Sequence, residues 1–335
     1  MFSYIYGDKK LMNFFQKTAL AALLATIFLI YVGAIVRATG SGLGCPDWPK
    51  CWGELIPPTS LDQVDFDKLN IEKFQKKNPS ITRESLAAEF NPVHVWVEFI
   101  NRLVSLPVGL FTLSTFLLSF QFLRKQKRVF FGSFAALALV LTNAILGAIV
   151  VSSGLKPGVI TLHMALAIIL ICVFVYIIYR GGQRLPSVNL GSQKGLLRST
   201  LIILFVACVV EGIMGSQVRE ITDELALKFK DTPRNVWHEI LEQKGIYLFH
   251  RSFSWIILVL GIFLFAKTRN ADGDLAQLSI KVTFGVILAQ MVLGVLMSHV
   301  SVHPVVQVLH IGLSSILIVA LFWLILTSRA QQQPH

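Results

Sequence analysis

Charged residues are scarce in this chain of 335 residues. Asp, Glu, Lys and Arg make up 15% of it, whereas 54% of the residues are hydrophobic. Soluble globular domains carry about 25% charged residues, so the composition argues against a soluble protein of this length. The sequence also lacks segments of alternating apolar and polar residues, which argues against a transmembrane β-barrel. These absences favour an all-α polytopic membrane protein.

The apolar residues gather in runs long enough to cross a bilayer, for which a helix needs about 20 residues. Eight such runs lie near 18–36, 98–120, 129–151, 160–179, 197–218, 246–266, 280–300 and 306–326. We therefore expect eight transmembrane helices.

Acidic residues are also in the minority, with 19 against 30 basic residues. The basic residues precede the first run or follow the second, fourth and sixth, at Lys9, Lys10, Lys17, Arg124, Lys125, Lys127, Arg128, Arg180, Arg184, Lys194, Arg198, Lys267, Arg269 and Lys281. Short loops rich in Lys and Arg lie in the cytoplasm, so both termini are predicted to be cytoplasmic. The net charge of +11 is then explained by topology, and no nucleic-acid partner is expected.

Neither a cleavable signal sequence nor an Arg- and Ser-rich transit sequence is evident at the start of the chain. We therefore expect a multi-pass protein of the bacterial cytoplasmic (inner) membrane rather than of an organelle, with lipid as its surroundings.

An internal repeat divides the chain. "LGAIVVSSGLKPGVITLHMAL" parallels "LGVLMSHVSVHPVVQVLHIGL", so that Gly147, Pro157 and His163 correspond to Gly294, Pro304 and His310 without gaps. In the same way "EFINR" (98–102) parallels "YLFHR" (247–251), and "GAIVR" (33–37) parallels "GSQVR" (215–219). Two four-helix halves with an even number of helices run parallel, which predicts a pseudo-twofold axis along the membrane normal.

The predicted organisation follows from this repeat. A cytoplasmic segment (1–17) precedes the first four-helix bundle (18–180), which carries an outer loop at 37–97. A cytoplasmic linker (181–196) leads to the second bundle (197–327), with an outer loop at 219–245, and to a tail (328–335). The spacing in "LDQVDFDKLNIEKFQKK" predicts a short amphipathic helix in the first outer loop, and the second loop looks similar.

Histidines at matching depth indicate a cofactor. His250 and His310 each follow the start of a predicted helix by a few residues, so both are expected near the outer surface. Two imidazoles on different helices of a bundle can hold one haem iron from opposite faces. Arg251 and Arg102 directly follow the ligand positions, where a guanidinium can bind haem propionates. Arg37 and Arg219, which end the "GAIVR" and "GSQVR" segments, are counted with these cofactor-binding residues.

Other interpretations of these histidines remain open. A histidine in a membrane helix can serve packing through a hydrogen bond. Zinc is a weaker alternative because the sequence has no CxxC or HxxxH cluster to supply four ligands.

The two halves differ at one ligand position. The first half keeps His163, but Asn101, a poor iron ligand, stands where the second half has His250. A haem held there would have an open or weakly occupied side, as oxygen chemistry requires. Glu98 lies three residues before Asn101 on the same helix face, where it can act as a general acid or base or stabilise a cationic intermediate. The alternative is a carboxylate favoured by the start of a helix.

Cysteine is rare, with four in the chain. Cys45 and Cys51 follow the first predicted helix on the outer, oxidising side, in "GLGCPDWPKCWG", and are expected to form a disulfide that is either structural or redox-active. Cys172 and Cys208 lie in apolar helices and are expected to serve packing.

Together these motifs resemble the haem A synthase (heme A synthase) family. The resemblance rests on "GAIVRATGSGLGCPDWPKCWG", the E-x-x-x-R at Glu98 and Arg102, the His250–Arg251 pair and the two P-x5-H repeats, and it spans all eight predicted helices. It implies an oxidoreductase that oxidises the C8 methyl group of haem O to a formyl group by successive hydroxylations, giving haem A for terminal oxidases.

The resemblance also implies roles for single residues. His250 and His310 become the haem b ligands, His163 the ligand of the substrate haem iron and Glu98 the catalytic carboxylate, and Cys45 with Cys51 becomes the outer-face disulfide. The chain departs from the family pattern at Asn101, where many members have a fourth histidine. The implied partners are haem O, haem A, a haem O synthase and an electron donor, with a homo-oligomer left open.

Two functions other than a haem-modifying enzyme are open to a protein with these residues. The first is a diheme b-type electron-transfer cytochrome without haem-modifying activity, which is expected to keep two complete histidine pairs and to need no Glu98. The second is a haem or small-molecule transporter, in which broken helices and a site near the midplane are usual.

Overall fold

The computed structural model describes residues 12–69, 71, 82–156, 158–182, 187–188, 190, 193–229, 234–268 and 274–328. Within these ranges, eight helices are long and apolar enough to span a bilayer. They are α1 (Phe14–Ala38), α4 (Pro92–Ser119), α5 (Lys127–Ser152), α6 (Val159–Arg180), α7 (Lys194–Lys228), α9 (Gly245–Thr268), α10 (Asp274–His299) and α11 (Pro304–Thr327). The predicted all-α membrane fold is confirmed.

Helix starts follow from local chemistry. At α1 the Asn13 side chain accepts a hydrogen bond from the Gln16 amide, and the Gln16 side chain bonds back to the Asn13 amide, which forms a capping box. α4 and α11 each begin with a proline in their first turn, where a missing N–H costs nothing. These starts set the register of the two helices that carry Asn101 and His310.

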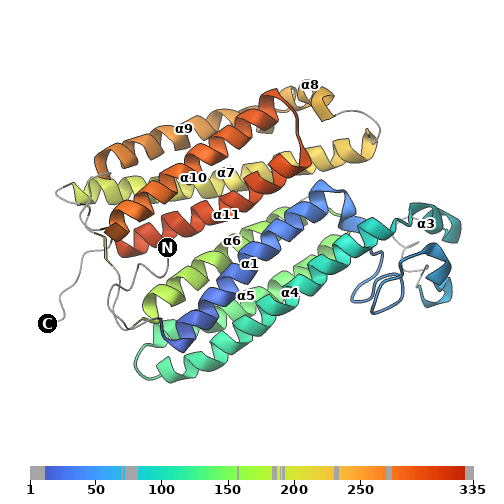
Figure 1. Cartoon of the computed structure of the whole chain (residues 1–335), viewed down its shortest axis with the longest axis horizontal. Coiled ribbons are helices and arrows are strands. Elements are labelled where there is room, and N and C mark those ends of the chain that lie inside the picture. Colours follow the sequence, from blue (N-terminus) through green and yellow to red (C-terminus); the bar gives the residue numbers. More distant parts are fainter. Residues whose placement is uncertain are drawn as a thin grey trace.

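The helices gather in two groups of four (Figure 1). In the first, α1 and α5 each contact both α4 and α6; in the second, α7 and α10 each contact both α9 and α11. Therefore α4 and α6 lie diagonally across one bundle, and α9 and α11 lie diagonally across the other. Contacts of α1 and α6 with α11, and of α6 with α7, join the groups.

The loops between the long helices lie toward the ends of the bundles. α3 (Arg83–Glu89) and α8 (Trp237–Glu242) lie at one end, opposite the end where α1 begins and α11 stops (Figure 1). The predicted pseudo-twofold axis, domain boundaries and cytoplasmic termini remain predictions.

The outer loops differ from the expectation in detail. In the described part of the first loop, 3-10 turns (η2, Leu61–Gln63; η3, Phe66–Lys68) stand where an amphipathic helix was expected. Residues 70 and 72–77 of that segment, Pro157 of the repeat and part of the predicted linker (183–186, 189, 191 and 192) lie outside the described residues. In the second loop α7 continues as a helix to Lys228.

Candidate functional site

A cavity of about 480 Å³ lies within the second bundle, and both predicted ligand histidines line it. His250 reaches it from α9 and His310 from α11, which lie diagonally across this bundle. Nδ1 of each imidazole is buried and makes no hydrogen bond with any described residue. Much of the remaining wall is apolar, for example at Ile257, Val295 and Leu317. Two imidazoles on opposite sides of an apolar cavity suit a flat, apolar, metal-containing ligand.

Each histidine of this cavity lies against a glycine of a neighbouring helix. A Cβ atom added to Gly215 of α7 would lie 3.2 Å from Cε1 of His250, and one added to Gly294 of α10 would lie 3.8 Å from Cε1 of His310. A side chain at Gly215 would therefore press on the imidazole, and the glycine lets the ring lie against the helix backbone.

The first bundle shows the same arrangement. A Cβ atom at Gly147 of α5 would lie 3.7 Å from Cε1 of His163, and one at Gly33 of α1 would lie 3.8 Å from Oδ1 of Asn101. Asn101 thus takes the place of a histidine next to the same kind of glycine. Oδ1 of Asn101 and Nδ1 of His163 are buried, and neither has a hydrogen-bond partner by distance and angle among the described residues.

The sequence repeat had aligned these glycines without giving them a role. Gly33 matches Gly215 and Gly147 matches Gly294. The presence of these glycines at equivalent positions of both halves is a sign in the sequence that they matter. Their contacts with His250, His310, His163 and Asn101 are visible in the structure alone.

Arginines from both bundles meet at the edge of the cavity. Arg219 is 7% exposed; its Nη1 donates to Oε1 of Gln307 at 2.6 Å and its Nη2 lies 2.8 Å from Oδ1 of Asp223. Arg37 of α1 binds the other oxygen of Asp223 at 2.6 Å. Both arginines line the cavity, so the first half supplies a cation to the second half's site.

A third arginine lies close to this cluster. Arg234, in η5 (Arg234–Val236), donates to the carbonyl oxygens of Ala38 and Val302. Burial lowers the pKa of Arg234, and the nearby Asp223 carboxylate opposes this shift. Asp223 was not among the predicted site residues, although it balances the charge of the arginines that were.

The remaining predicted arginines fall into two environments. Arg251 lines the cavity, packs over the Tyr247 ring at 5.7 Å and lies 3.2 Å from Oε1 of Glu242. Arg102 instead turns to the loop after α1: its Nη1 donates to the carbonyl oxygens of Asp47 and Lys50, at 3.0 and 2.8 Å.

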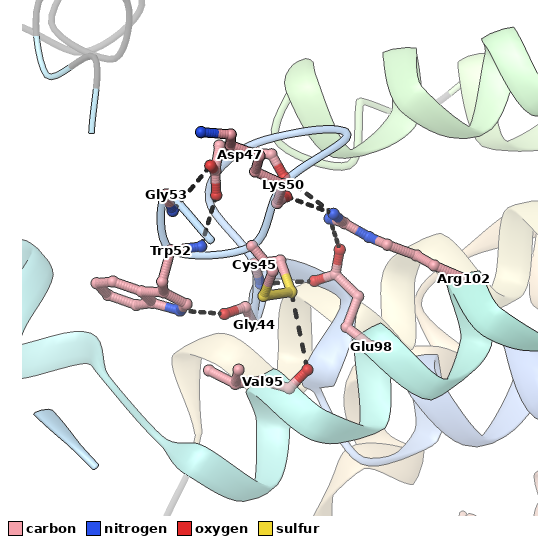
Figure 2. Close-up of a disulfide and its surroundings, with 10 residues drawn as sticks. Gly44, Cys45, Asp47, Lys50, Trp52, Gly53, Val95, Glu98 and Arg102 are labelled. Carbon is pink, nitrogen blue, oxygen red and sulfur yellow. Dashed lines mark hydrogen bonds and ion pairs between the residues drawn. A yellow bond between two sulfur atoms is a disulfide. The ribbon is translucent and has the colours of Figure 1, made fainter. Parts of the chain in front are cut away.

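Glu98 also contacts this loop (Figure 2). Its carboxylate is 3% exposed, accepts a hydrogen bond from the Cys45 amide at 2.8 Å and pairs with Nη2 of Arg102 at 2.5 Å. The two oxygens of Glu98 thus have separate partners, one from the loop and one from α4. The structure places Glu98 in contact with the loop that holds the cysteine pair.

The predicted disulfide between Cys45 and Cys51 is present. Both cysteines are fully buried, and the surrounding disulfide loop (residues 41–54) is closed by further bonds. The Asp47 carboxylate accepts from the Trp52 and Gly53 amides, and the Trp52 indole donates to the Gly44 carbonyl (Figure 2). A Cβ atom at Gly44 would lie 2.3 Å from the His94 carbonyl oxygen, so only glycine permits this approach of the loop to α4.

Comparison with known proteins places these features in a family context. The family model COX15-CtaA, described as cytochrome oxidase assembly protein, matches residues 16–322. Relatives named heme A synthase include one from Alkalihalophilus pseudofirmus, 23% identical over 308 residues that cover 90% of this chain and 91% of the relative. One from Wolbachia pipientis is 26% identical over 316 residues, covering 87% and 86%. One from Shewanella oneidensis is 27% identical over 184 residues, covering 55% of this chain and 51% of the relative.

Proposed function

Because the chain belongs to the COX15-CtaA family of cytochrome oxidase assembly proteins, we propose that it is a haem A synthase. In this proposal it is an oxidoreductase that converts the C8 methyl group of haem O to a formyl group by successive hydroxylations. The observation that carries the proposal is the cavity of the second bundle, with His250 and His310 on diagonal helices.

The second bundle is proposed to hold haem b as the resident cofactor. The donor set fits, because the imidazoles of His250 and His310 line an apolar cavity from diagonal helices and arginines lie at its edge. His250 and His310 would hold the iron, and Arg37, Arg219 and Arg251 would bind the propionates. When bound, haem b supplies one-electron transfer for the oxidation.

The first bundle is proposed to take the substrate. His163 would hold the iron of haem O, and Asn101 would face it from the diagonal helix as a weaker group. The equivalent placement of these two side chains, each against a glycine of a neighbouring helix as His250 and His310 are, supports this assignment. An incomplete ligand pair leaves one side of the substrate open to oxidant.

Glu98 is proposed as the catalytic carboxylate. Its contacts with Arg102 and the Cys45 amide fix the position of the carboxyl group. A carboxylate held in a fixed position suits the stabilisation of positive charge that develops on the substrate during oxidation. To accept a proton, the carboxylate would first release one of these two partners.

The first test is pigment extraction and mass analysis after co-expression with a haem O source. We expect haem A or its hydroxymethyl precursor with the unaltered chain and with Glu89→Gln, an exposed control in α3. Glu98→Gln should retain the b-type spectrum but yield neither product. Because Glu98 bonds to the disulfide loop, thiol labelling of the variant is the control. If Cys45 and Cys51 are still paired, the loss of activity is due to the missing carboxylate and not to a disrupted loop.

Two outcomes would contradict parts of this proposal. If the unaltered chain contains haem b alone despite available haem O, the diheme electron-transfer cytochrome becomes the better interpretation. If Glu98→Gln forms haem A at the normal rate, Glu98 is not catalytic.

The cellular setting completes the proposal. The eight apolar helices indicate a multi-pass membrane protein, and we place it in the bacterial cytoplasmic membrane with both haem sites near the outer face. A haem O synthase is proposed to supply the substrate and a separate donor the electrons.

A further inference from the structure

An ionisable side chain of α7 lies in the cavity without a role in the proposal above. Glu211 belongs to the membrane-spanning part of α7 and lines the same cavity as His250 and His310. A carboxylate at this depth is costly to bury, and such residues usually pair with a specific partner.

His250 is the partner that Glu211 approaches. Oε1 of Glu211 lies 3.3 Å from Nδ1 of His250. Oε2 of Glu211 and Nδ1 of His250 are both buried, and neither makes a hydrogen bond with another residue in the described ranges. At 3.3 Å the two groups lie within hydrogen-bonding distance, and Nδ1 of His250 has no other partner in the described part of the chain.

One helix face positions the imidazole in two ways. Gly215 lies one turn after Glu211 on α7 and lets the His250 ring lie against the helix backbone, since a Cβ atom there would lie 3.2 Å from Cε1. α7 thus provides a glycine against the ring carbon and a carboxylate beside the adjoining nitrogen.

The internal repeat provides a comparison within the same chain. The correspondence of Gly33 with Gly215 pairs Glu211 with Leu29, just as His250 is paired with Asn101. The second half has both His250 and Glu211, whereas the first half has Asn101 and Leu29 at the equivalent positions. The two positions at which the halves differ are therefore in contact in the second half.

We propose that Glu211 is a positioning residue for His250 and accepts a hydrogen bond from its Nδ1–H. This bond would fix the tautomer that leaves Nε2 for the iron and make the imidazole a stronger donor, as carboxylates next to ligand histidines do. The inference rests on the proposed binding of haem b by His250 and His310.

The test compares three variants of the full-length, haem-loaded protein. Glu211→Leu installs the residue of the first half, Glu211→Gln keeps a neutral acceptor of the same shape, and Glu224→Gln is an exposed control on the same helix. The measurements are haem b content, the rate of haem transfer to apomyoglobin, the midpoint potential and the electron paramagnetic resonance g-values of the ferric haem.

We expect Glu211→Leu to lose haem about 10–100-fold faster, the range found for partners of metal ligands. Its midpoint potential should shift to more positive values because a weaker donor stabilises the ferric state less, and its g-values should change. Glu211→Gln should change in the same direction by less, and Glu224→Gln should match the unaltered protein.

The outcomes separate this inference from the proposed function. An unaltered protein that binds no haem b would overturn both. If the unaltered protein holds haem b and neither Glu211 variant changes haem loss, potential or g-values, the role of Glu211 is refuted while haem binding stands. If the Glu211→Leu protein does not accumulate, the same measurements on the isosteric Glu211→Gln variant test the role of Glu211.

Discussion

At the scale of single residues, glycines make room for the side chains that we propose as ligands. Gly33, Gly147, Gly215 and Gly294 each face one of the four equivalent ligand positions on a neighbouring helix. In membrane bundles small residues let helices and rings approach closely. The tightest of the four contacts is that between Gly215 and His250, so this glycine is the most sensitive to substitution.

Gly215→Ala should therefore weaken haem b binding. The added methyl group presses on the His250 ring, and overpacking of this kind costs about 1–3 kcal/mol, which corresponds to about 5- to 150-fold in affinity. Haem b per protein, measured as the pyridine haemochrome, should fall. Gly195→Ala on the same helix is the control, because nothing lies within 4 Å of its Cβ position and Gly195 does not line the cavity. Equal haem content in the two variants would contradict the expectation.

At the scale of elements, the long α7 connects the site to the rest of the protein. Its last turns, beyond the predicted end at 218, carry Arg219 and Asp223. Through Asp223 this extension binds Arg37 of α1, so one carboxylate joins cations from both bundles. The disulfide loop also joins one element to another, since its backbone groups form hydrogen bonds with Glu98 and Arg102 of α4.

Removing the charge of Asp223 should separate α1 from the extension of α7. Asp223→Asn loses two ion pairs and leaves the buried Arg219 with hydrogen bonds to Gln307 and Thr222, at 2.6 and 3.3 Å. Hydrogen bonds to charged groups contribute about 1.5–3 kcal/mol each, so thermal unfolding in detergent should occur at a clearly lower temperature. Glu224→Gln, at the next position and exposed, should unfold like the unaltered protein. A melting temperature shared by both variants would show that the cluster contributes no stability.

At the scale of the whole molecule, α1, α6 and α11 hold the two bundles together. Tyr179 of α6 and Trp323 of α11 pack edge to face with ring centroids 6.0 Å apart. Tyr31 of α1 lies directly on Gly312 of α11, where an added Cβ atom would come within 2.0 Å of the ring. The interface between the bundles is therefore close-packed at these points.

Gly312→Ala should force the bundles apart locally. The aromatic ring of Tyr31 must move, and we expect a loss of stability of about 1–3 kcal/mol together with lower yield of folded protein from membranes. Gly285→Ala in α10 is the matched control, since nothing lies within 4 Å of its Cβ position. Size-exclusion chromatography and thermal unfolding would test this, and an unaffected Gly312→Ala protein would argue against tight packing between the bundles.

The helical membrane fold, its eight spans and the family resemblance could all be predicted from the sequence alone. Hydrophobic length and composition are local properties, and burial in a bilayer leaves few alternatives to a helix. The repeat also drew attention to His250 and His310, which line one cavity in the structure; their role as iron ligands stays a prediction. The pairing of Cys45 with Cys51 followed from their separation by six residues in a short loop.

Which side chains are in contact depends on the tertiary structure and could not be predicted from the sequence. Glu98 and Arg102 belong to one helix, and nothing in their spacing shows that they bind the backbone of the disulfide loop. Arg37 and Arg219 are repeat partners, yet they converge on Asp223 of the second half. Such contacts join residues up to 186 positions apart, and they depend on how the helices pack. The contact between Glu211 and His250 was hidden in the sequence for the same reason.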